Sequence, residues 1–238
     1  MITSLPDRLV AIDLTKQYNS HTALNQLNLR LKAGDIFCLL GQNGAGKTTT
    51  INIFLGFIEA SAGKAFINDI EVRPGDNTLK KHLAYIPEVV QLYGNLTGVE
   101  NLHFFSRLAG FDYSPEALAQ FLQHAGLQPE AHRKKLVTYS KGMRQKVAIA
   151  IALAKDAAVI FMDEPTSGLD PKATQEFTTI VKQLGSKGKT ILMATHDIFN
   201  AVAVGTHIGI MKNGMLMHTL KTADITANEL QKLYLETI

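Results

Sequence analysis

The sequence predicts an α/β protein with a mainly parallel β-sheet, an antiparallel β region near the N-terminus and an inserted α-helical segment. Apolar runs that suit buried parallel strands, such as GDIFCLLG and AAVIFMDE, are separated by segments of helical periodicity. The first third of the chain has mostly strand-like patterns, whereas about 65 residues in the middle have helical patterns only. Strands and helices alternate again after Asp156. This order favours one α/β core that a helical segment interrupts.

The strands of the first third are expected where polar and apolar residues partly alternate. RLVAIDL and ALNQLNLRL show such alternation, and GDIFCLLG is a continuous apolar run typical of a buried parallel strand. The segment TINIFLGFI follows with helical spacing, and KAFINDIEV returns to strand character. We therefore expect an antiparallel β region, together with the first strand and helix of the core, in this part of the chain.

Two helices are predicted in the middle segment from their capping residues. Thr97 and Glu100 form a capping-box sequence, after which Leu102, Phe105 and Leu108 share one helix face. A second helix opens at SPEALAQFLQHAG, with a serine cap and a proline in the first turn. The apolar face of this second helix is expected to consist of Leu118, Phe121, Leu122 and Ala125.

Strand and helix patterns return at AAVIFMDE, TQEFTTIVKQLG and KTILMATHD. The chain is therefore expected to be one domain, with an α/β core of residues 1–87 and 156–238 and a helical subdomain of residues 88–155. The last segment, TADITANELQKLYLETI, predicts a helix capped by Thr226 and Glu229, but its sequence indicates no function.

The composition excludes several other classes of protein. The 238 residues are 46% hydrophobic and 19% charged, as in ordinary globular proteins, and the formal net charge of +3 is too small to indicate nucleic-acid binding by itself. Cys38 is the only cysteine, so we expect neither a disulfide framework nor a thiolate metal cluster, and its apolar surroundings predict a buried thiol. No secretory signal and no run of about 18 apolar residues occurs, which predicts a cytosolic chain that reaches a membrane only through a partner.

The segment GQNGAGKT matches the P-loop pattern G-x-x-x-x-G-K-[ST] in full and lies between an apolar strand and a helix. Its glycines allow backbone N–H groups to curl around phosphates, and the helix N-terminus adds its dipole. Lys47 is expected to reach the β- and γ-phosphates of a nucleotide, and the Thr48 hydroxyl is expected to ligate Mg²⁺. The residues predicted to contact the nucleotide here are Gly41, Asn43, Gly44, Ala45, Gly46, Lys47, Thr48 and Thr49.

Three polar residues at strand ends complete the predicted hydrolysis site. A P-loop requires a second Mg²⁺ ligand at the end of a neighbouring strand, and the run AVIFMDE supplies Asp163 there. Glu164 follows directly and is predicted to polarise the attacking water as a general base. His196 ends the apolar run TILMATHD. Because strand C-termini line the ligand crevice of α/β sheets, we expect its neutral imidazole to donate a hydrogen bond near the γ-phosphate.

The order of the P-loop, YSKGM, VIFMDEP, SGLD and ATHD along residues 9–215 resembles the ATP-binding subunit of ABC (ATP-binding cassette) transporters. The resemblance implies a P-loop NTPase (RecA-like) core that binds and hydrolyses ATP with Mg²⁺. It implies that Ser140 and Gly142 belong to the signature motif, which contacts the γ-phosphate of ATP held by a partner subunit, and that His196 is the switch histidine. It also implies that Tyr18 stacks on adenine and that Asp170 ends the D-loop SGLD.

Two parts of the chain depart from the family's pattern. Lys141 and Met143 replace the first glycine and the glutamine of the signature LSGGQ, and Lys141 either adds charge toward the partner's phosphate or faces solvent. Glu88 stands where the Q-loop normally has glutamine, and its carboxylate is predicted to approach Mg²⁺ directly or through water. Gln91, three residues later, is the alternative. Both departures, with LYGNLTGVENL, resemble the ATPases of bacterial ABC-2-type exporters.

The resemblance implies an ATP-hydrolysing subunit that dimerises on ATP and powers a separate ABC-2-type membrane permease, for export of a drug, peptide, lipid or other cargo. Its implied partners are a second ATP-binding subunit, with a homodimer expected, and the permease. The permease is expected to dock near residues 88–105, with Leu92, Tyr93 and Leu96 as contacts. The chain would then lie at the cytoplasmic face of the membrane, held there by the permease.

Two other functions are compatible with a P-loop. An ABC-type ATPase acting on nucleic acid would use the basic residues near the signature, but such chains tend to carry long coiled coils or two cassettes, and no sustained heptads occur here. A solvated helix face is therefore favoured for these basic residues, and no nucleic-acid partner is expected. A P-loop kinase or regulatory switch would leave YSKGM, SGLD and the terminal histidine without a role. The basic residues are Lys134, Lys135, Lys141, Arg144 and Lys146.

Overall fold

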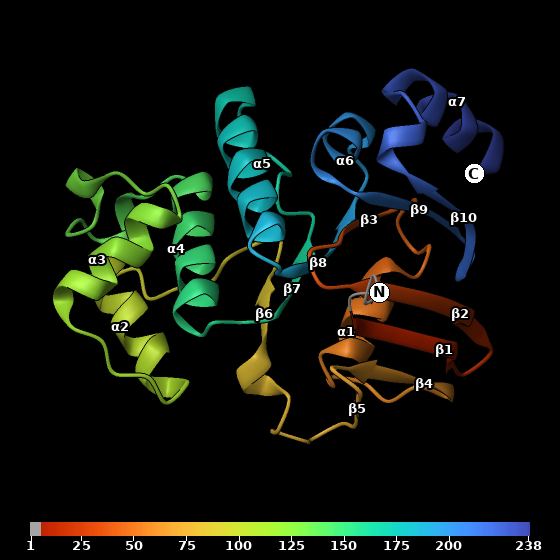
Figure 1. Cartoon of the computed structure of the whole chain (residues 1–238), viewed down its shortest axis with the longest axis horizontal. Helices are drawn as coiled ribbons and strands as arrows, with labels where there is room; N and C mark the ends of the chain where they lie inside the picture. Colours follow the sequence, from red (N-terminus) through yellow and green to blue (C-terminus); the bar gives the residue numbers. More distant parts are fainter. Residues whose placement is uncertain (1–5) are drawn as a thin grey trace, which may run out of the picture.

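The computed structural model describes residues 6–238, which form an α/β fold built on two β-sheets (Figure 1). The smaller sheet is antiparallel and has the strand order β2-β1-β4-β5. Its strands are β1 (Asp7–Tyr18), β2 (His21–Lys32), β4 (Ala62–Ile67) and β5 (Ile70–Glu71). The prediction of an antiparallel β region near the N-terminus is therefore confirmed.

The larger sheet has six strands in the order β10-β9-β3-β8-β7-β6, and only β10 is antiparallel to its neighbour. Its strands are β3 (Ile36–Leu40), β6 (Leu83–Ile86), β7 (Val159–Asp163), β8 (Thr190–Thr195), β9 (His207–Lys212) and β10 (Met215–Lys221). The C-terminal ends of β3, β7 and β8 lie side by side at one edge, because these strands are parallel and adjacent. The mainly parallel sheet predicted from the sequence is confirmed.

Seven α-helices and several short 3-10 turns connect these strands within the described residues. The helices are α1 (Lys47–Phe54), α2 (Gly98–Leu108), α3 (Pro115–His124), α4 (Lys141–Ala154), α5 (Pro171–Ser186), α6 (Ile198–Val204) and α7 (Ala227–Thr237). Figure 1 shows α2, α3 and α4 together at one end of the molecule, away from the antiparallel sheet. These helices lie within the segment predicted as helical, while the subdomain boundaries at residues 88 and 155 stay a prediction.

The side-chain alternation of the parallel strands divides the core into two clusters. Phe37 and Leu39 of β3 face the cluster that includes the antiparallel sheet and α1, whereas Cys38 faces the cluster that includes α4, α5 and α6. Successive residues of a strand point to opposite faces, so a strand covered on both faces is apolar throughout. This explains why GDIFCLLG has no polar positions between Ile36 and Leu40, and it confirms the predicted burial of Cys38.

Capping residues start the helices where the sequence predicts them. The Thr97 hydroxyl accepts from the Glu100 N–H, and the Glu100 carboxylate accepts from the Thr97 N–H at 2.7 Å, which closes the capping box of α2. Thr226 and Glu229 make the same reciprocal pair at the start of α7. On the predicted face of α2, Leu102 is buried, whereas Leu108 at the last residue of the helix is 74% exposed and lines a surface cavity together with Phe105.

The β9–β10 turn joins the two sheets at the P-loop. Asn213 and Gly214 both have positive φ, which is typical of a two-residue hairpin turn. The Gly214 N–H donates to the Ala45 carbonyl at 3.0 Å, and the Gly214 carbonyl accepts from the Asn25 N–H at 2.9 Å. The P-loop is therefore bonded to the larger sheet's last hairpin, and this hairpin in turn is bonded to β2. No helix within residues 6–238 combines the length and the apolar character needed to cross a bilayer.

Candidate active site

The P-loop runs from the end of β3 into α1, so the first N–H groups of the helix face the loop's concave side. Gly46 is the N-cap residue of α1 and has φ +107°, a conformation that residues with a side chain rarely adopt. Gly44 also has a positive φ, of +83°. No side chain caps the start of α1, which leaves its N–H groups to bind an anion.

Lys47 is held across the loop rather than extended into solvent. Its ammonium donates to the carbonyls of Gly41 at 2.6 Å and Gln42 at 3.2 Å, and the residue is only 6% exposed. Burial lowers the pKa of the Lys47 ammonium, while the negative charges of Glu164 and Asp163 oppose that shift. The cation therefore lies between the P-loop and the two carboxylates, where phosphate groups of a nucleotide would need it.

Thr48 and Asp163 meet directly. The Thr48 hydroxyl donates to Asp163 Oδ2 at 2.9 Å, although the two residues are 115 positions apart in the chain. Burial raises the pKa of the Asp163 carboxyl, and the charges of Glu164 and Glu88 add to this, against the opposing effects of the Thr48 hydrogen bond and the Lys47 charge. Four oxygen-bearing side chains, those of Thr48, Asp163, Glu164 and Glu88, therefore gather where the sequence predicts a cation.

The side chains of Thr48, Asp163 and Glu88 are suited to a Mg²⁺ ion that is bound together with the phosphates of a nucleotide. Mg²⁺ takes oxygen ligands and usually binds through one or two carboxylates plus phosphate oxygens and water, not through a cage of protein side chains. The described part of the chain contains no group of three or more His, Cys, Asp or Glu residues suited to hold a metal by themselves. Thr48, Asp163 and Glu88 could each supply one oxygen ligand.

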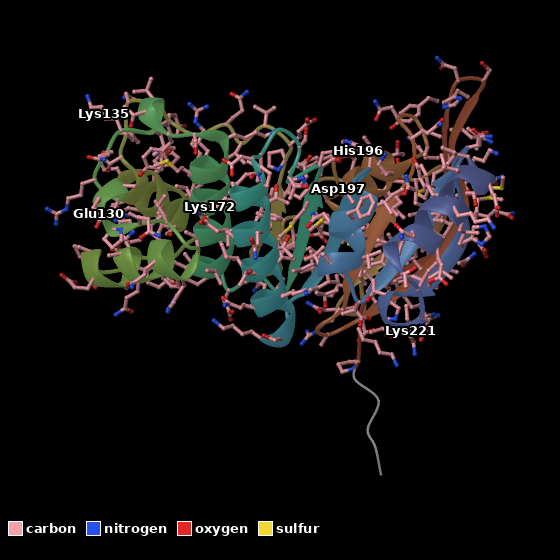
Figure 2. The ribbon with its side chains drawn as sticks, turned by 90° about the horizontal axis from the view of Figure 1, so that it is seen from above. Glu130, Lys135, Lys172, His196, Asp197 and Lys221 are labelled. Atoms are coloured by element: carbon pink, nitrogen blue, oxygen red, sulfur yellow. The ribbon has the colours of Figure 1, made fainter. Side chains whose placement is uncertain are left out.

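Glu164 and His196 form a pair across the ends of neighbouring strands. Glu164 Oε2 lies 2.8 Å from His196 Nδ1 and also accepts the His196 backbone N–H at 3.3 Å. Glu164 has φ +44°, and its own N–H donates to the carbonyl of Ala194 in β8, which fixes this strained residue. Figure 2 shows His196 and Asp197 next to each other near the middle of the molecule, between α2–α4 and the C-terminal elements.

The contact between His196 and Glu164 determines which nitrogen of the imidazole ring can face a phosphate. The ring turns Nδ1 toward the Glu164 carboxylate, which only accepts hydrogen bonds when ionised, at 2.8 Å. This leaves Nε2 as the ring nitrogen that can face a phosphate. His196 therefore lies where it can orient Glu164.

Glu88, rather than Gln91, lies at this site. Glu88 lines the cavity in front of the P-loop, and its Oε1 accepts from the Ser167 hydroxyl at 2.9 Å. Gln91 is exposed and lines neither of the two cavities that border the P-loop. The bond between Glu88 and Ser167 has no signal in the sequence, because the two residues are 79 positions apart and belong to different loops.

The cavity in front of the P-loop has a volume of about 490 Å³, within the range of ordinary ligand sites. Tyr18 lies at its rim and is partly exposed, with the Lys16 ammonium 5.0 Å from the centre of its ring. An exposed aromatic ring at this rim is available for stacking on a base. The predicted site residues that line this cavity are Tyr18, Asn43, Gly44, Gly46, Lys47, Thr48, Thr49, Glu88, Asp163 and Glu164.

A second cavity, of about 530 Å³, borders the outer side of the P-loop and the Glu164–His196 pair. Gly41 and Asn43 also line it, while Ala45 is buried within the loop. One of its lining residues, Tyr234 of α7, was not predicted from the sequence. No motif surrounds Tyr234, and it is far from the P-loop along the chain, so the pattern of residues carries no sign of this contact.

The predicted residues Ser140, Gly142 and Asp170 do not reach the P-loop cavity of their own chain. They line a separate, smaller cavity of about 160 Å³ between α4 and α5. Ser140 caps α4 by accepting from the Met143 N–H, and Asp170 caps α5 by accepting from the Ala173 N–H at 2.9 Å. The structure therefore separates two groups of predicted site residues within one chain.

The structure also places three of the basic residues near the signature. The Lys141 ammonium lies beside Gly168 of the D-loop, 3.9 Å from where a side chain at Gly168 would begin. Lys146 forms an ion pair with Glu176 at 2.6 Å, so its charge is already matched. Lys135 lies at the outer end of the α2–α4 region in Figure 2, well away from His196.

Gln145 is a residue of this region that the sequence did not single out. It is buried in α4, and its amide donates to the Pro165 carbonyl, one residue after Glu164. The helix that begins with Ser140 is thereby bonded to the loop that carries the proposed base. Only burial and this contact identify Gln145, since an isolated glutamine on a basic helix has no distinguishing pattern.

Comparison with known proteins identifies relatives over most of the chain. A family model described as ABC transporter matches residues 24–167. The bacitracin transport ATP-binding protein BcrA of Bacillus licheniformis is 36% identical over 210 residues, which cover 87% of this chain and 68% of BcrA. The probable multidrug ABC transporter ATP-binding protein YbhF of Escherichia coli K12 is 32% identical over 219 residues, covering 91% of this chain but only 38% of YbhF.

Two solved structures have the same fold at comparable identity. One is the dimeric structure of a post-hydrolysis state of the ATP-binding cassette MJ0796 bound to ADP and Pi, with a TM-score of 0.80 and 28% identity. The match covers 90% of this chain and 98% of MJ0796. The other is an ATP-binding subunit of an ABC transporter, with a TM-score of 0.84 and 30% identity, covering 96% of this chain and 98% of that subunit.

Proposed function

Because this chain belongs to the ABC transporter family as an ATP-binding cassette that hydrolyses ATP to drive transport, we propose that it works as an ATP-dependent homodimer that powers a separate ABC-2-type permease for export. The observation that carries the proposal is the division of the predicted site residues. The P-loop, Asp163 and Glu164 surround one cavity, while Ser140 and Gly142 lie at another, so a complete site requires a second copy of the chain.

In the proposed dimer, each ATP is bound by the P-loop of one subunit and by the signature residues of the other. Ser140 supplies a hydroxyl and Gly142 a backbone N–H at the start of α4, where the helix dipole favours the γ-phosphate. Tyr18 stacks on the adenine ring. Asp170 contributes by fixing the D-loop through its cap on α5.

Glu164 is the proposed general base. Its carboxylate takes a proton from the attacking water, and His196 keeps the carboxylate in position through Nδ1. Lys47 neutralises phosphate charge from the P-loop side. Thr48, Asp163 and Glu88 would hold Mg²⁺, which when bound neutralises charge on the phosphate oxygens.

The proposed permease surface lies at residues 88–105. Tyr93 is exposed there, and its ring packs against Phe104 and Phe105 at centroid distances of 5.0 and 6.1 Å. Exposed apolar side chains grouped in this way are typical of interaction surfaces. Leu92 and Leu96 complete the proposed contacts, and the permease would hold the cassette at the cytoplasmic face of the membrane. No nucleic-acid partner is part of this proposal.

The cargo is proposed from the relatives. BcrA is named for bacitracin transport, YbhF for probable multidrug transport, and LnrL of Bacillus subtilis for linearmycin resistance. A drug or an antimicrobial peptide is therefore the proposed class of cargo. Copurification of the chain with the membrane protein encoded by an adjacent gene would support the permease, whereas a cassette that binds no such membrane protein would argue against it.

The Glu164→Gln variant tests the dimer and the base together. Glutamine has nearly the same shape but accepts no proton, so ATP binding should persist while turnover falls at least a hundredfold. We expect the variant to form a stable dimer with ATP and Mg²⁺ in size-exclusion chromatography with light scattering. The double variant that adds Ser140→Ala should dimerise less. Hydrolysis at the parent rate, or a Glu164→Gln chain that stays monomeric with ATP, would contradict the proposal.

A further inference from the structure

Helix α7 brings a tyrosine to the hydrolysis site from the last described element of the chain. Tyr234 lines the 530 Å³ cavity together with Glu164, His196 and Glu88. The remaining lining comes from the outer side of the P-loop, at residues 41–43. In Figure 1, α7 lies beside α6 and β9, at the same end of the larger sheet as β10.

Several contacts fix α7 in this position. Leu230 is fully buried, and Leu233 packs on the same core cluster as Tyr234. The capping box described above holds the helix start, and the Lys212 ammonium donates to the Thr237 carbonyl at 2.6 Å near its end. A half-buried ring on a helix anchored at both ends has little freedom to move. The packing of α7 therefore holds the Tyr234 ring at the cavity.

The chemistry of the lining shows what the tyrosine adds. Glu88 and Glu164 are acceptors when ionised, and His196 Nδ1 lies 2.8 Å from Glu164 Oε2. Burial, and secondly the negative charge of Glu164, raises the pKa of the Tyr234 hydroxyl. The phenol therefore keeps its proton at neutral pH and is an uncharged donor on the side of the cavity formed by Glu164 and His196, while the side chains of Gln42 and Asn43 line it from the P-loop.

We propose that Tyr234 is a further phosphate-contacting residue, whose hydroxyl donates a hydrogen bond to the terminal phosphate of ATP from the side of the Glu164–His196 pair. The inference rests on the proposed function, because it takes that cavity as the place where the terminal phosphate and the attacking water meet. A neutral donor suits this place, since it stabilises the charge that develops on the phosphoryl oxygens and does not displace the general base.

Removal of the hydroxyl alone gives the first test. Tyr234→Phe keeps the ring and its packing, so we expect kcat to fall about tenfold, because one hydrogen bond to a developing charge is lost. KM for ATP should change less than threefold, since the P-loop provides most of the binding, and the melting temperature should stay within 2 °C or so of the parent. Leu235→Ala, at a neighbouring position that is 64% exposed and outside the cavity, is the matched control and should keep the parent's kcat.

A fluorescence experiment tests the position of the residue without relying on turnover. The chain has no tryptophan, so Tyr234→Trp introduces a single reporter. In the Glu164→Gln background, we expect ATP with Mg²⁺ to change the emission of Trp at position 234 clearly more than that of Trp placed at 235.

The outcomes separate this inference from the proposed function. A parent chain that hydrolyses ATP, combined with a Tyr234→Phe kcat equal to the parent's, overturns the inference and leaves the proposed function intact. Equal losses of kcat in Tyr234→Phe and Leu235→Ala also overturn it, because they would indicate a general effect of α7. A parent chain without ATPase activity refutes the proposed function, and equal emission changes in the Tyr234→Trp and Leu235→Trp variants overturn the inference.

Discussion

Two glycines of the P-loop allow a prediction whose size follows from the geometry. Gly46 and Gly44 both have positive φ, but their surroundings differ. A Cβ at Gly46 would lie 2.7 Å from the Ala23 carbonyl oxygen and 3.4 Å from the Gly214 Cα, whereas a Cβ at Gly44 would have nothing within 4 Å. Gly46→Ala thus adds a backbone clash to the conformational strain, and Gly44→Ala adds the strain alone.

The cost of each substitution can be estimated from these terms. The left-handed conformation costs a non-glycine residue about 1–2 kcal/mol, and alanine recovers roughly 0.4–1 kcal/mol by restricting the unfolded chain. For Gly46→Ala the clash adds about 1–3 kcal/mol, because Ala23 belongs to a paired strand and cannot move away freely. The free energy of unfolding should therefore fall by about 1–4.5 kcal/mol for Gly46→Ala and by about 0–1.5 kcal/mol for Gly44→Ala.

Urea unfolding of the nucleotide-free chains measures this difference. Both variants should keep the parent's m-value, so the midpoints can be compared directly. The Gly46→Ala midpoint should lie clearly below that of Gly44→Ala. Equal midpoints, or a larger loss in Gly44→Ala, would refute the argument that contact with the Ala23 carbonyl, rather than φ alone, requires glycine at position 46.

Two further predictions concern titration and the metal. Burial raises the pKa of the Cys38 thiol to about 12, so the unfolded chain loses this proton at lower pH than the folded chain does. The stability contributed by the neutral thiol is complete below pH of about 8.5 and falls as pH rises from there toward 12. Labelling of the native chain by a thiol reagent should be negligible at neutral pH and should accelerate over that range. Rapid labelling at pH 7 would contradict this prediction. Glu88→Gln should keep the Ser167 hydrogen bond but remove a charge near Asp163, so the Mg²⁺ concentration for half-maximal ATPase activity should rise several-fold at unchanged ATP affinity. An unchanged Mg²⁺ midpoint would remove Glu88 from the proposed metal ligands.

The local features of the fold were predictable because each depends on residues close in sequence. The capping boxes of α2 and α7 require only positions three apart, and the buried strand β3 requires only five consecutive apolar residues. Local rules were less reliable at the end of a helix. The apolar series TINIFLGFI continues past the end of α1 at Phe54, because Leu55 is buried without being helical and Gly56 turns the chain at φ +68°.

The contacts between distant segments were not predictable in the same way. The strand-end rule correctly predicts that Asp163, Glu164 and His196 lie at one edge of the sheet, since parallel strands align their C-terminal ends. It gives no information about which imidazole nitrogen faces Glu164, because that depends on side-chain rotamers. Tyr234 was missed for a related reason: the docking of α7 depends on the burial of Leu230 and on the contacts of its helix, which no periodic pattern links to the P-loop.

The β9–β10 turn links the antiparallel sheet to the P-loop that faces the nucleotide. Gly214 bonds to Ala45 on one side and to Asn25 on the other. A displacement of the P-loop at Ala45 must therefore carry the hairpin with it or break the Gly214–Ala45 hydrogen bond, and a displacement of the hairpin acts in the same way on β2. The sheet that contributes Tyr18 to the rim of the nucleotide cavity is thus linked to the P-loop through backbone hydrogen bonds, so the wall that faces the base and the wall that faces the phosphates are mechanically coupled.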